Sequence, residues 1–411
     1  MRVLLWHGYL LGGTGSNVYT RALAREWSLA GHDVTVVCQE RHPERYDVGA
    51  ARVIVPELPG GLLPVFVLDR YEGLEARLLI DMSQTERDAF VEANAAALRE
   101  LAPADLVFAN HVLLGAPVGA ASGMRFRVKA HGSELEYAMR GRPDLARWGA
   151  ETLASAEVVY AGSVHIRDVL EEVASHADRV EIVPPGVDVE EFRPAPREQA
   201  LAALLEEARA DPPNPGNREE RHPDEANAGR FERFFADQRP TVLYFGKLIE
   251  NKGVHVLCDA LAGLDARTVV VGFGDFRERL ESLAPAGTLF TGALEHRHLR
   301  HLLPLCDVAV VPSIFPEAFG MVAAEAAAAG VLPVVSAHSG LAEVAAGIGE
   351  EVGPEAVDLL SFPTGDAEAL HERLAAVLAL SVERRHELGL AARRAVERRW
   401  SWTVVAARLL E

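Results

Sequence analysis

The stretch RVLLWHGYLLGGTGSNVYTRALAREWSLAGHDVTVVC, residues 2–38, decides the fold class. Residues 2–7 form a short apolar run that predicts a buried strand, and a glycine-rich turn follows it. Apolar side chains then recur at helical spacing, with Ser16 placed to cap the helix and Gly31 to end it. Residues 33–38 predict the next strand. Strand, turn, helix and strand make one βαβ unit, which is typical of a parallel sheet with helices on both faces.

The same order of elements continues along the chain and restarts near residue 240. Strand patterns lie at 104–110, 126–132, 157–163 and 180–186 in the first half, and at 241–246, 268–274, 288–292, 308–313 and 331–337 in the second. This repetition predicts an α/β protein of two doubly wound, Rossmann-like domains. Such domains bind ligands at the carboxyl ends of their strands, so we expect a cleft between them.

A charged segment separates the two halves. We place the N-terminal domain at 1–190 and the C-terminal domain at 240–395. Residues 191–239 carry helical patterns and the interruption DPPNPGN (211–217) but no core strand, which indicates a joint or insertion. The end of the chain, about 396–411, predicts an amphipathic helix that can pack back on the first domain.

The composition excludes several classes of protein. A chain of 411 residues with 49% hydrophobic residues can bury two cores. Its formal net charge of -19, without a basic block, disfavours nucleic acid and anionic membranes as partners. The N-terminal run resembles a buried strand more than a signal peptide or membrane span, so we expect a cytoplasmic protein without integral membrane association. The three cysteines have no metal-site spacing and are expected to be buried thiols.

Two carboxylates stand out in SIFPEAFGMVAAEAAAAG, residues 313–330. Glu317 and Glu325 lie eight residues apart in a run that is otherwise apolar, small or glycine. A helix is expected from about Gly320 to Gly330, and its first backbone N–H groups favour an anion such as phosphate. A carboxylate among buried alanines is costly without a partner, so Glu325 should meet hydroxyls or cations, and a ribose diol fits.

Two lysines follow the first strand of the second half. In YFGKLIENKG, Lys247 and Lys252 lie at the same edge of the sheet as the glutamate stretch. Two cations beside a free helix N-terminus favour a diphosphate ligand.

These motifs resemble those of the retaining glycosyltransferases of family 4, which have the GT-B fold. The E-x7-E signature is matched by Glu317 and Glu325, and the pattern G-R-L-x-x-x-K-G is matched by GKLIENKG, with Lys247 in place of arginine. GGTGSN, KAHGSE, VPPGVDVEEFRP, VGFGDFRERL and HSGLAEV follow in the family's order. The charged joint is longer than is usual in the family.

The resemblance implies a role for each motif. Glu317 would bind hydroxyls of the donor sugar, Glu325 would bind the ribose, and the backbone at Leu294 would read the base. His131 would lie beneath the sugar, and it is grouped with Glu317 as catalytic. The donor would be held by Gly13, Gly246, Lys247, Lys252, Leu294, Phe319, Gly320, Met321, Val322 and Glu325.

The implied activity is transfer of a hexose from an α-linked UDP- or GDP-sugar to an acceptor hydroxyl, giving an α-glycoside. The nucleotide sugar is a substrate, and no cofactor or metal is expected, since no DxD pair lies at a strand end. The acceptor is a small molecule, a glycan or a lipid-linked compound, and homo-oligomerisation is left open.

Three other functions are compatible with a two-domain α/β protein of this kind. A dinucleotide-dependent dehydrogenase is disfavoured because Val18 stands where the G-x-G-x-x-G fingerprint needs its third glycine. A nucleotide-sugar epimerase would need the same diphosphate site. A non-catalytic nucleotide-sugar-binding protein would need it too, but the retention of both glutamates, both lysines and His131 favours an enzyme.

Overall fold

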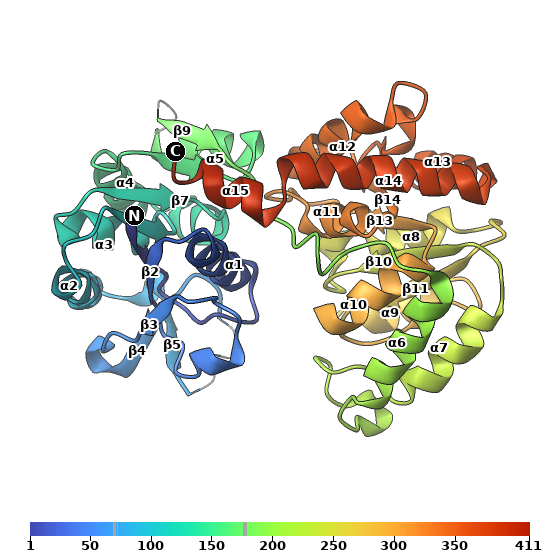
Figure 1. The fold of residues 1–411 in the computed structure, drawn as a ribbon, viewed down its shortest axis with the longest axis horizontal. Coiled ribbons are helices and arrows are strands. Elements are labelled where there is room, and N and C mark those ends of the chain that lie inside the picture. The colour runs from blue at the N-terminus through green and yellow to red at the C-terminus, as the bar shows by residue number, and fades with distance from the viewer. Residues whose placement is uncertain (69–70, 72, 176–178) are drawn as a thin grey trace. The chain divides into compact units, whose positions relative to one another are not determined.

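The computed structural model describes residues 1–68, 71, 73–175 and 179–411. The chain divides into two compact units (Figure 1). The first consists of Met1–Gly186 together with Trp402–Glu411, and the second is Val187–Ser401. The second unit therefore includes the segment 191–239 that the sequence analysis set apart as a joint.

The first unit contains a seven-stranded parallel sheet in the order β3-β2-β1-β6-β7-β8-β9. Its strands are β1 Arg2–Trp6, β2 Asp33–Val37, β3 Arg52–Ile54, β6 Leu106–Asn110, β7 Phe126–Lys129, β8 Val159–Ala161 and β9 Val180–Ile182. The helices are α1 Gly15–Leu29, α2 Gln84–Glu100, α3 Gly115–Ser122, α4 Pro143–Leu153, α5 Val164–Ala174 and α15 Trp402–Arg408. A separate parallel pair is formed by β4 Leu62–Val65 and β5 Glu75–Leu78.

Alternate residues of β1 face opposite sides of this sheet. Val3 and Leu5 belong to the cluster that contains α1 side chains, whereas Leu4 and Trp6 belong to the cluster that contains α2 and α3 side chains. All four are fully buried. Both faces are thus covered, as the βαβ pattern predicted.

The ends of α1 agree only in part with the sequence pattern. Gly31 has φ +86° and follows the last turn, so the predicted end is confirmed. Ser16 is wrong as the cap, because the helix begins at Gly15 and Thr14 occupies the N-cap position without a side-chain cap bond. Ser16 instead lies inside the first turn, where its carbonyl accepts a hydrogen bond from Thr20 Oγ1.

The second unit contains a six-stranded parallel sheet in the order β12-β11-β10-β13-β14-β15. Its strands are β10 Thr241–Phe245, β11 Arg267–Val271, β12 Leu289–Phe290, β13 Val308–Val311, β14 Leu332–Ser336 and β15 Ser361–Phe362. Its helices are α6 Arg197–Arg209, α7 Asn227–Ala236, α8 Val254–Ala260, α9 Arg277–Leu283, α10 His296–Leu302, α11 Met321–Ala328, α12 Ser339–Val352, α13 Ala367–Ala379 and α14 Val382–Arg399. The predicted doubly wound fold is confirmed for both sheets, although the short strands β3, β4, β5 and β15 were not predicted.

The alanine-rich helix α11 lies against β13 and β14. Ala323, Ala324 and the run 326–328 are fully buried. Small side chains let the helix approach the sheet closely, which is the packing expected from the sequence. At its carboxyl end, the Arg393 guanidinium of α14 donates to Ala328 O at 2.5 Å.

The end of the chain forms two helices, not the single predicted helix over about 396–411. Helix α14 ends at Arg399 and α15 begins at Trp402. The break occurs because Trp400 leaves helical geometry, with φ -131°, and its carbonyl accepts a hydrogen bond from Val187 N at 2.6 Å. Helix α15 packs on α1, where Trp27 Nε1 donates to Ala406 O at 2.8 Å (Figure 1).

Candidate functional site

Lys252 and Glu317 meet at the carboxyl edge of the second unit's sheet. Lys252 ends a short 3₁₀ turn, Glu250–Lys252, after β10, and Glu317 lies in the loop between β13 and α11. The Lys252 ammonium donates to Glu317 Oε1 at 2.5 Å, and Ser313 Oγ donates to the same oxygen at 2.6 Å. Both charged side chains are partly exposed, at 32% and 20%, so a ligand can reach them.

The segment after β14 supports the backbone of Glu317. The Glu317 N–H donates to Ser339 Oγ at 2.9 Å, and the Glu317 carbonyl accepts a hydrogen bond from Gly340 N at 3.1 Å. His338 completes the support, because its Nε2 lies 2.7 Å from Ser313 O and its Nδ1 lies 2.9 Å from Ser339 Oγ. The HSG sequence therefore fixes the loop that carries the first glutamate.

The amino end of α11 is open to an anion. Gly320 is the N-cap with φ +112°, and a β-carbon there would lie 2.7 Å from Leu341 Cδ2, so glycine is required. Among the described residues, the N–H groups of Gly320, Met321 and Val322 have no intramolecular acceptor. These groups and the helix dipole create positive potential at this point.

Glu325 lies in the second turn of α11 and is only 8% exposed. Its carboxylate accepts no hydrogen bond within the described part of the chain. His296 Nε2 lies 3.9 Å from Oε1, and His296 Nδ1 lies 3.6 Å from the Glu191 carboxylate. Burial raises the pKa of Glu325 to about 7, with His296 opposing this shift and Glu191 adding to it.

Four further predicted residues lie near this edge. Gly246 follows β10 directly, and Lys247 is exposed. The Lys247 carbonyl accepts from Tyr244 OH at 2.8 Å, but no described residue pairs with its ammonium. Leu294 is partly buried in the turn between β12 and α10 and packs on the core. Phe319 is buried, with its ring edge-to-face against Trp400.

In the first unit, His131 belongs to a buried polar cluster. Its Nε2 lies 2.7 Å from Asn110 Oδ1, and its ring lies 4.6 Å from that of His111. Glu134 accepts from His131 N at 2.9 Å and pairs with His111 Nδ1 at 3.2 Å. Burial opposes ionisation of Glu134, but His111 and backbone N–H groups outweigh it and lower its pKa. The pKa of His131 is lowered well below its ordinary value by burial, then by His111 and Lys129, which favours a neutral imidazole.

Several buried polar atoms of this unit lack partners among the described residues, and three of them, His7 Nδ1, Tyr9 OH and His111 Nε2, lie on rings that contact one another. The rings of His7 and His111 are stacked at 5.8 Å, and Tyr9 packs edge-to-face on both. Burial, then the charge of His111, lowers the pKa of His7 to about 3, so this ring is neutral at pH 7. Buried polar atoms without partners are costly, which indicates that a ligand or water completes them.

Gly13, the other predicted residue of the first unit, lies in the turn before α1. It has φ +92°, and a β-carbon there would meet no atom within 4 Å. Its backbone geometry suits glycine, and the space beside it is open.

Family models match both halves of the chain in order. A model described as "Glycosyltransferase Family 4" matches residues 13–191, and one described as "Glycosyl transferases group 1" matches residues 226–395. The chain belongs to the family 4 glycosyltransferases.

Curated relatives agree with this assignment. This glycosyltransferase is 28% identical to a GDP-mannose-dependent alpha-(1-6)-phosphatidylinositol monomannoside mannosyltransferase of Mycobacterium tuberculosis, over 71% of this chain and 70% of that protein. It is also 28% identical to a GDP-mannose-dependent monoacylated alpha-(1-6)-phosphatidylinositol monomannoside mannosyltransferase of Corynebacterium glutamicum, over 68% and 67% of the two chains.

Solved structures share its GT-B fold. The sucrose-phosphate synthase of Thermosynechococcus elongatus aligns with a TM-score of 0.69 at 21% identity, over 99% of this chain and 97% of that one. HepE of Anabaena, solved with UDP and glucose, aligns with a TM-score of 0.69 at 16% identity, over 100% and 98%. The predicted GT-B architecture is therefore confirmed.

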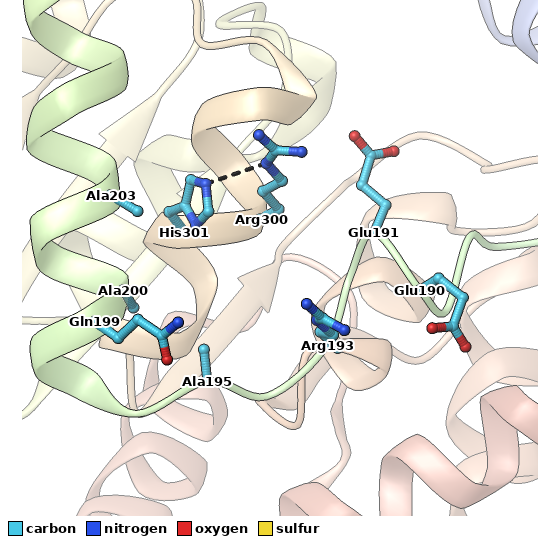
Figure 2. A pocket seen from close by; sticks show the side chains of 9 residues that line it. All are labelled: Glu190, Glu191, Arg193, Ala195, Gln199, Ala200, Ala203, Arg300 and His301. Atoms are coloured by element: carbon cyan, nitrogen blue, oxygen red, sulfur yellow. Dashed lines mark hydrogen bonds between the residues drawn. The ribbon is translucent and has the colours of Figure 1, made fainter. Parts of the chain in front are cut away.

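A pocket of about 170 Å³ in the second unit of the glycosyltransferase contains none of the predicted site residues. Figure 2 shows Arg300 and His301 of α10 opposite α6, with Arg300 Nε donating to His301 Nε2 at 3.2 Å. The pocket is lined by Glu190, Glu191, Arg193, Ala195, Gln199, Ala200, Ala203, Arg300 and His301. Glu191 also lies beside His296, so the pocket adjoins the surroundings of Glu325.

The described residues contain no group of three or more His, Cys, Asp or Glu side chains arranged to hold a metal ion. Within the same residues, no helix combines the length and apolar character needed to cross a bilayer.

Several polar residues near the candidate site of the glycosyltransferase were not predicted from the sequence. Ser313, Ser339 and His296 contact the glutamates, and His7 and His111 accompany His131. His7 and His111 each follow a strand directly, after β1 and β6, and this position at the carboxyl edge was the signal that could have identified them.

Proposed function

We propose that this glycosyltransferase moves a hexose from an α-linked nucleoside diphosphate sugar to an acceptor hydroxyl with retention of configuration, giving an α-glycoside. The observation that carries the proposal is the Lys252–Glu317 pair beside the open end of α11, with Glu325 buried in the next turn of the same helix. The carboxyl edge of the second unit's sheet thus offers one group suited to an anion, one suited to a sugar and one suited to a ribose.

The donor site divides into three parts. Lys247, Lys252 and the backbone of 319–322 neutralise and bind the diphosphate. Glu317 binds sugar hydroxyls, which would compete with Lys252 and Ser313 for its oxygens. Glu325 accepts hydrogen bonds from the ribose hydroxyls, whereas none of the described residues donates a hydrogen bond to its buried carboxylate.

Retention follows from how these groups are used. With both glutamates bound to hydroxyls, neither serves as a base on the face opposite the diphosphate. The acceptor oxygen attacks the anomeric carbon from the face that the diphosphate leaves. The bond from that carbon to phosphate oxygen breaks, the new glycosidic bond forms, and the acceptor proton passes to the diphosphate. Lys252 and the end of α11 stabilise the charge that develops there, so no metal is required.

The relatives suggest which donor to test first. The mycobacterial and corynebacterial relatives carry GDP-mannose dependence in their names, and HepE was solved with UDP and glucose. We therefore propose GDP-mannose as the first donor and UDP-glucose as the second.

We assign the acceptor to the first unit. His7, Tyr9 and His111 each present a buried polar atom that lacks a partner among the described residues, which suits the hydroxyls of a sugar or cyclitol. His131 and Gly13 keep their proposed roles at the donor, with His131 as a hydrogen-bonding group beneath the sugar and not a nucleophile. If the assignment holds, Tyr9→Phe should raise the KM for acceptor and leave the donor KM unchanged; a change in donor KM alone would contradict it.

The direct test of retention is proton NMR of the product during early turnover with GDP-mannose or UDP-glucose, using a panel of monosaccharide, myo-inositol and phosphatidylinositol mannoside acceptors. The anomeric signals should be those of an α-glycoside. A β-glycoside from an α-linked donor would overturn the retaining assignment and the roles given to Glu317 and Glu325.

A further inference from the structure

The segment 192–225 lies between the ranges matched by the two family models. It is nevertheless built into the second unit, where α6 packs against α7 and α10 (Figure 1). Among its contacts, one set lies on either side of a short turn, the residues from Gly292 to Glu295 that include Leu294.

On the amino-terminal side, the segment pairs with the backbone that leads into the turn. Asp224 N donates to Thr291 O at 2.8 Å, and Ala293 N donates to His222 O at 3.2 Å. Gly292 has φ +72°, and a β-carbon there would lie 2.5 Å from Asp224 Oδ1. The fit between this glycine and the segment leaves no room for a side chain.

Asp224 is itself held rigidly. Its carboxylate, 2% exposed, accepts two hydrogen bonds from the Arg277 guanidinium at 2.8 and 2.6 Å. Arg230 adds a third contact at 3.3 Å. A bidentate, buried pair of this kind restricts orientation as well as position.

On the carboxyl-terminal side, the end of α6 holds the start of α10. Asp211 Oδ1 lies 2.9 Å from His298 Nε2 and also pairs with Arg297. His298 Nδ1 accepts from Glu295 N at 3.3 Å, so the proton resides on Nε2 and is donated to Asp211. Glu207 and Glu295 also accept hydrogen bonds from Arg297, at 2.9 and 2.7 Å.

We propose that residues 192–225 are a specificity element that sets the shape of the Leu294 turn and thereby selects the nucleobase of the donor. This inference rests on the proposed function, in which the donor is a nucleoside diphosphate sugar, and on the expectation from the family resemblance that the backbone at Leu294 reads the base. Asp211 and Asp224 act as positioning residues, since they hold the turn from its two sides without themselves touching the donor. The diphosphate and sugar contacts at Lys252 and Glu317 do not depend on them.

The test measures binding of GDP, UDP, ADP and inorganic pyrophosphate by calorimetry in wild type and in Asp211→Asn. The variant should bind the preferred nucleoside diphosphate about tenfold more weakly and discriminate less among the three bases, because a charge-assisted contact is lost. Pyrophosphate affinity should not change. Asp211→Glu should restore part of the discrimination, which a general loss of packing would not allow.

A matched control is Glu198→Gln, which removes the same charge from the exposed first turn of α6 and should alter none of the four affinities. If Asp211→Asn does not fold, Arg277→Lys weakens the other side of the turn while keeping the charge, and it should reduce discrimination in the same way. Unchanged base discrimination in a folded variant overturns the inference alone. A wild-type protein that binds none of the three nucleoside diphosphates overturns the proposed function and the inference together.

Discussion

Replacing Glu325 with glutamine should make the unliganded protein more stable at pH 8 and weaken its binding of nucleotide. The carboxylate is 8% exposed and accepts no hydrogen bond from the described residues, and its pKa is raised from 4.5 to about 7. Ionising it in the folded protein at high pH therefore costs roughly 3 kcal/mol relative to the unfolded chain. Glutamine fills the same space without that cost.

The direction in which stability changes with pH follows from the direction in which the pKa of Glu325 is shifted. A raised pKa means that the folded protein binds the proton more tightly than the unfolded chain does. The stability contributed by Glu325 is fully present below pH 4.5 and is lost as pH rises through about 7. The difference between Glu325→Gln and wild type should accordingly be roughly 3 kcal/mol at pH 8 and about 1 kcal/mol at pH 5.

Urea unfolding at the two pH values measures this difference, with the fluorescence of Trp400 and the other tryptophans as the probe. Glu198→Gln, on the exposed start of α6, is the control for loss of one negative charge and should show no such pH dependence. Calorimetry with GDP and UDP measures the expected loss of nucleotide affinity in Glu325→Gln. An equal stability difference at pH 5 and pH 8 would refute the account of Glu325 as a buried carboxylate that accepts no hydrogen bond from the described residues.

Four further experiments test the residues proposed to bind the diphosphate and the sugar, and the need for a metal. Lys252→Ala should weaken nucleoside diphosphate binding about ten- to a hundredfold in calorimetry, the loss of one charge-assisted contact, and unchanged affinity would remove Lys252 from the site. Lys247→Arg should preserve or improve that affinity, because a guanidinium can bind phosphate through two donors, and a large loss would contradict this. Glu317→Gln should lower kcat far more than nucleotide affinity, and equal losses would assign Glu317 to nucleotide binding instead. Turnover should survive EDTA, whereas complete loss restored by magnesium or manganese would show that a metal takes part.

The parts of the fold that the sequence predicted are those fixed by local patterns. The long apolar runs of β1, β10 and β13 and the glycines at both ends of α11 each carry their own signal. The short edge strands β3 and β15 carry little signal, because only two or three residues pair with one neighbour. The break at Trp400 depends on a hydrogen bond to Val187, more than 200 residues earlier, and no local pattern encodes it.

In the candidate site, too, the sequence predicts some residues, whereas the contacts between them depend on the three-dimensional structure. Glu317, Glu325, Lys247 and Lys252 could be proposed from spacing and resemblance, and the sheet order places their loops at one edge. The contact between Lys252 and Glu317 and the neighbourhood of His296 and Glu325 arise from side chains of separate loops, so only the three-dimensional structure reveals them.

The alanine packing of α11 has a consequence for anyone who wishes to change the donor of this enzyme. Side chains that consist of one methyl group cannot adopt new rotamers, so this helix can respond to a substitution only by moving as a body. Its far end is held by Arg393, which also donates to Phe192 O at 2.9 Å, next to Glu191. Mutant libraries confined to residues of the proposed donor site would therefore change the backbone position of α11 very little. Variation at Arg393, which lies behind the helix, offers an engineer a way to shift the amino end of α11 by small steps without altering any residue of the proposed donor site.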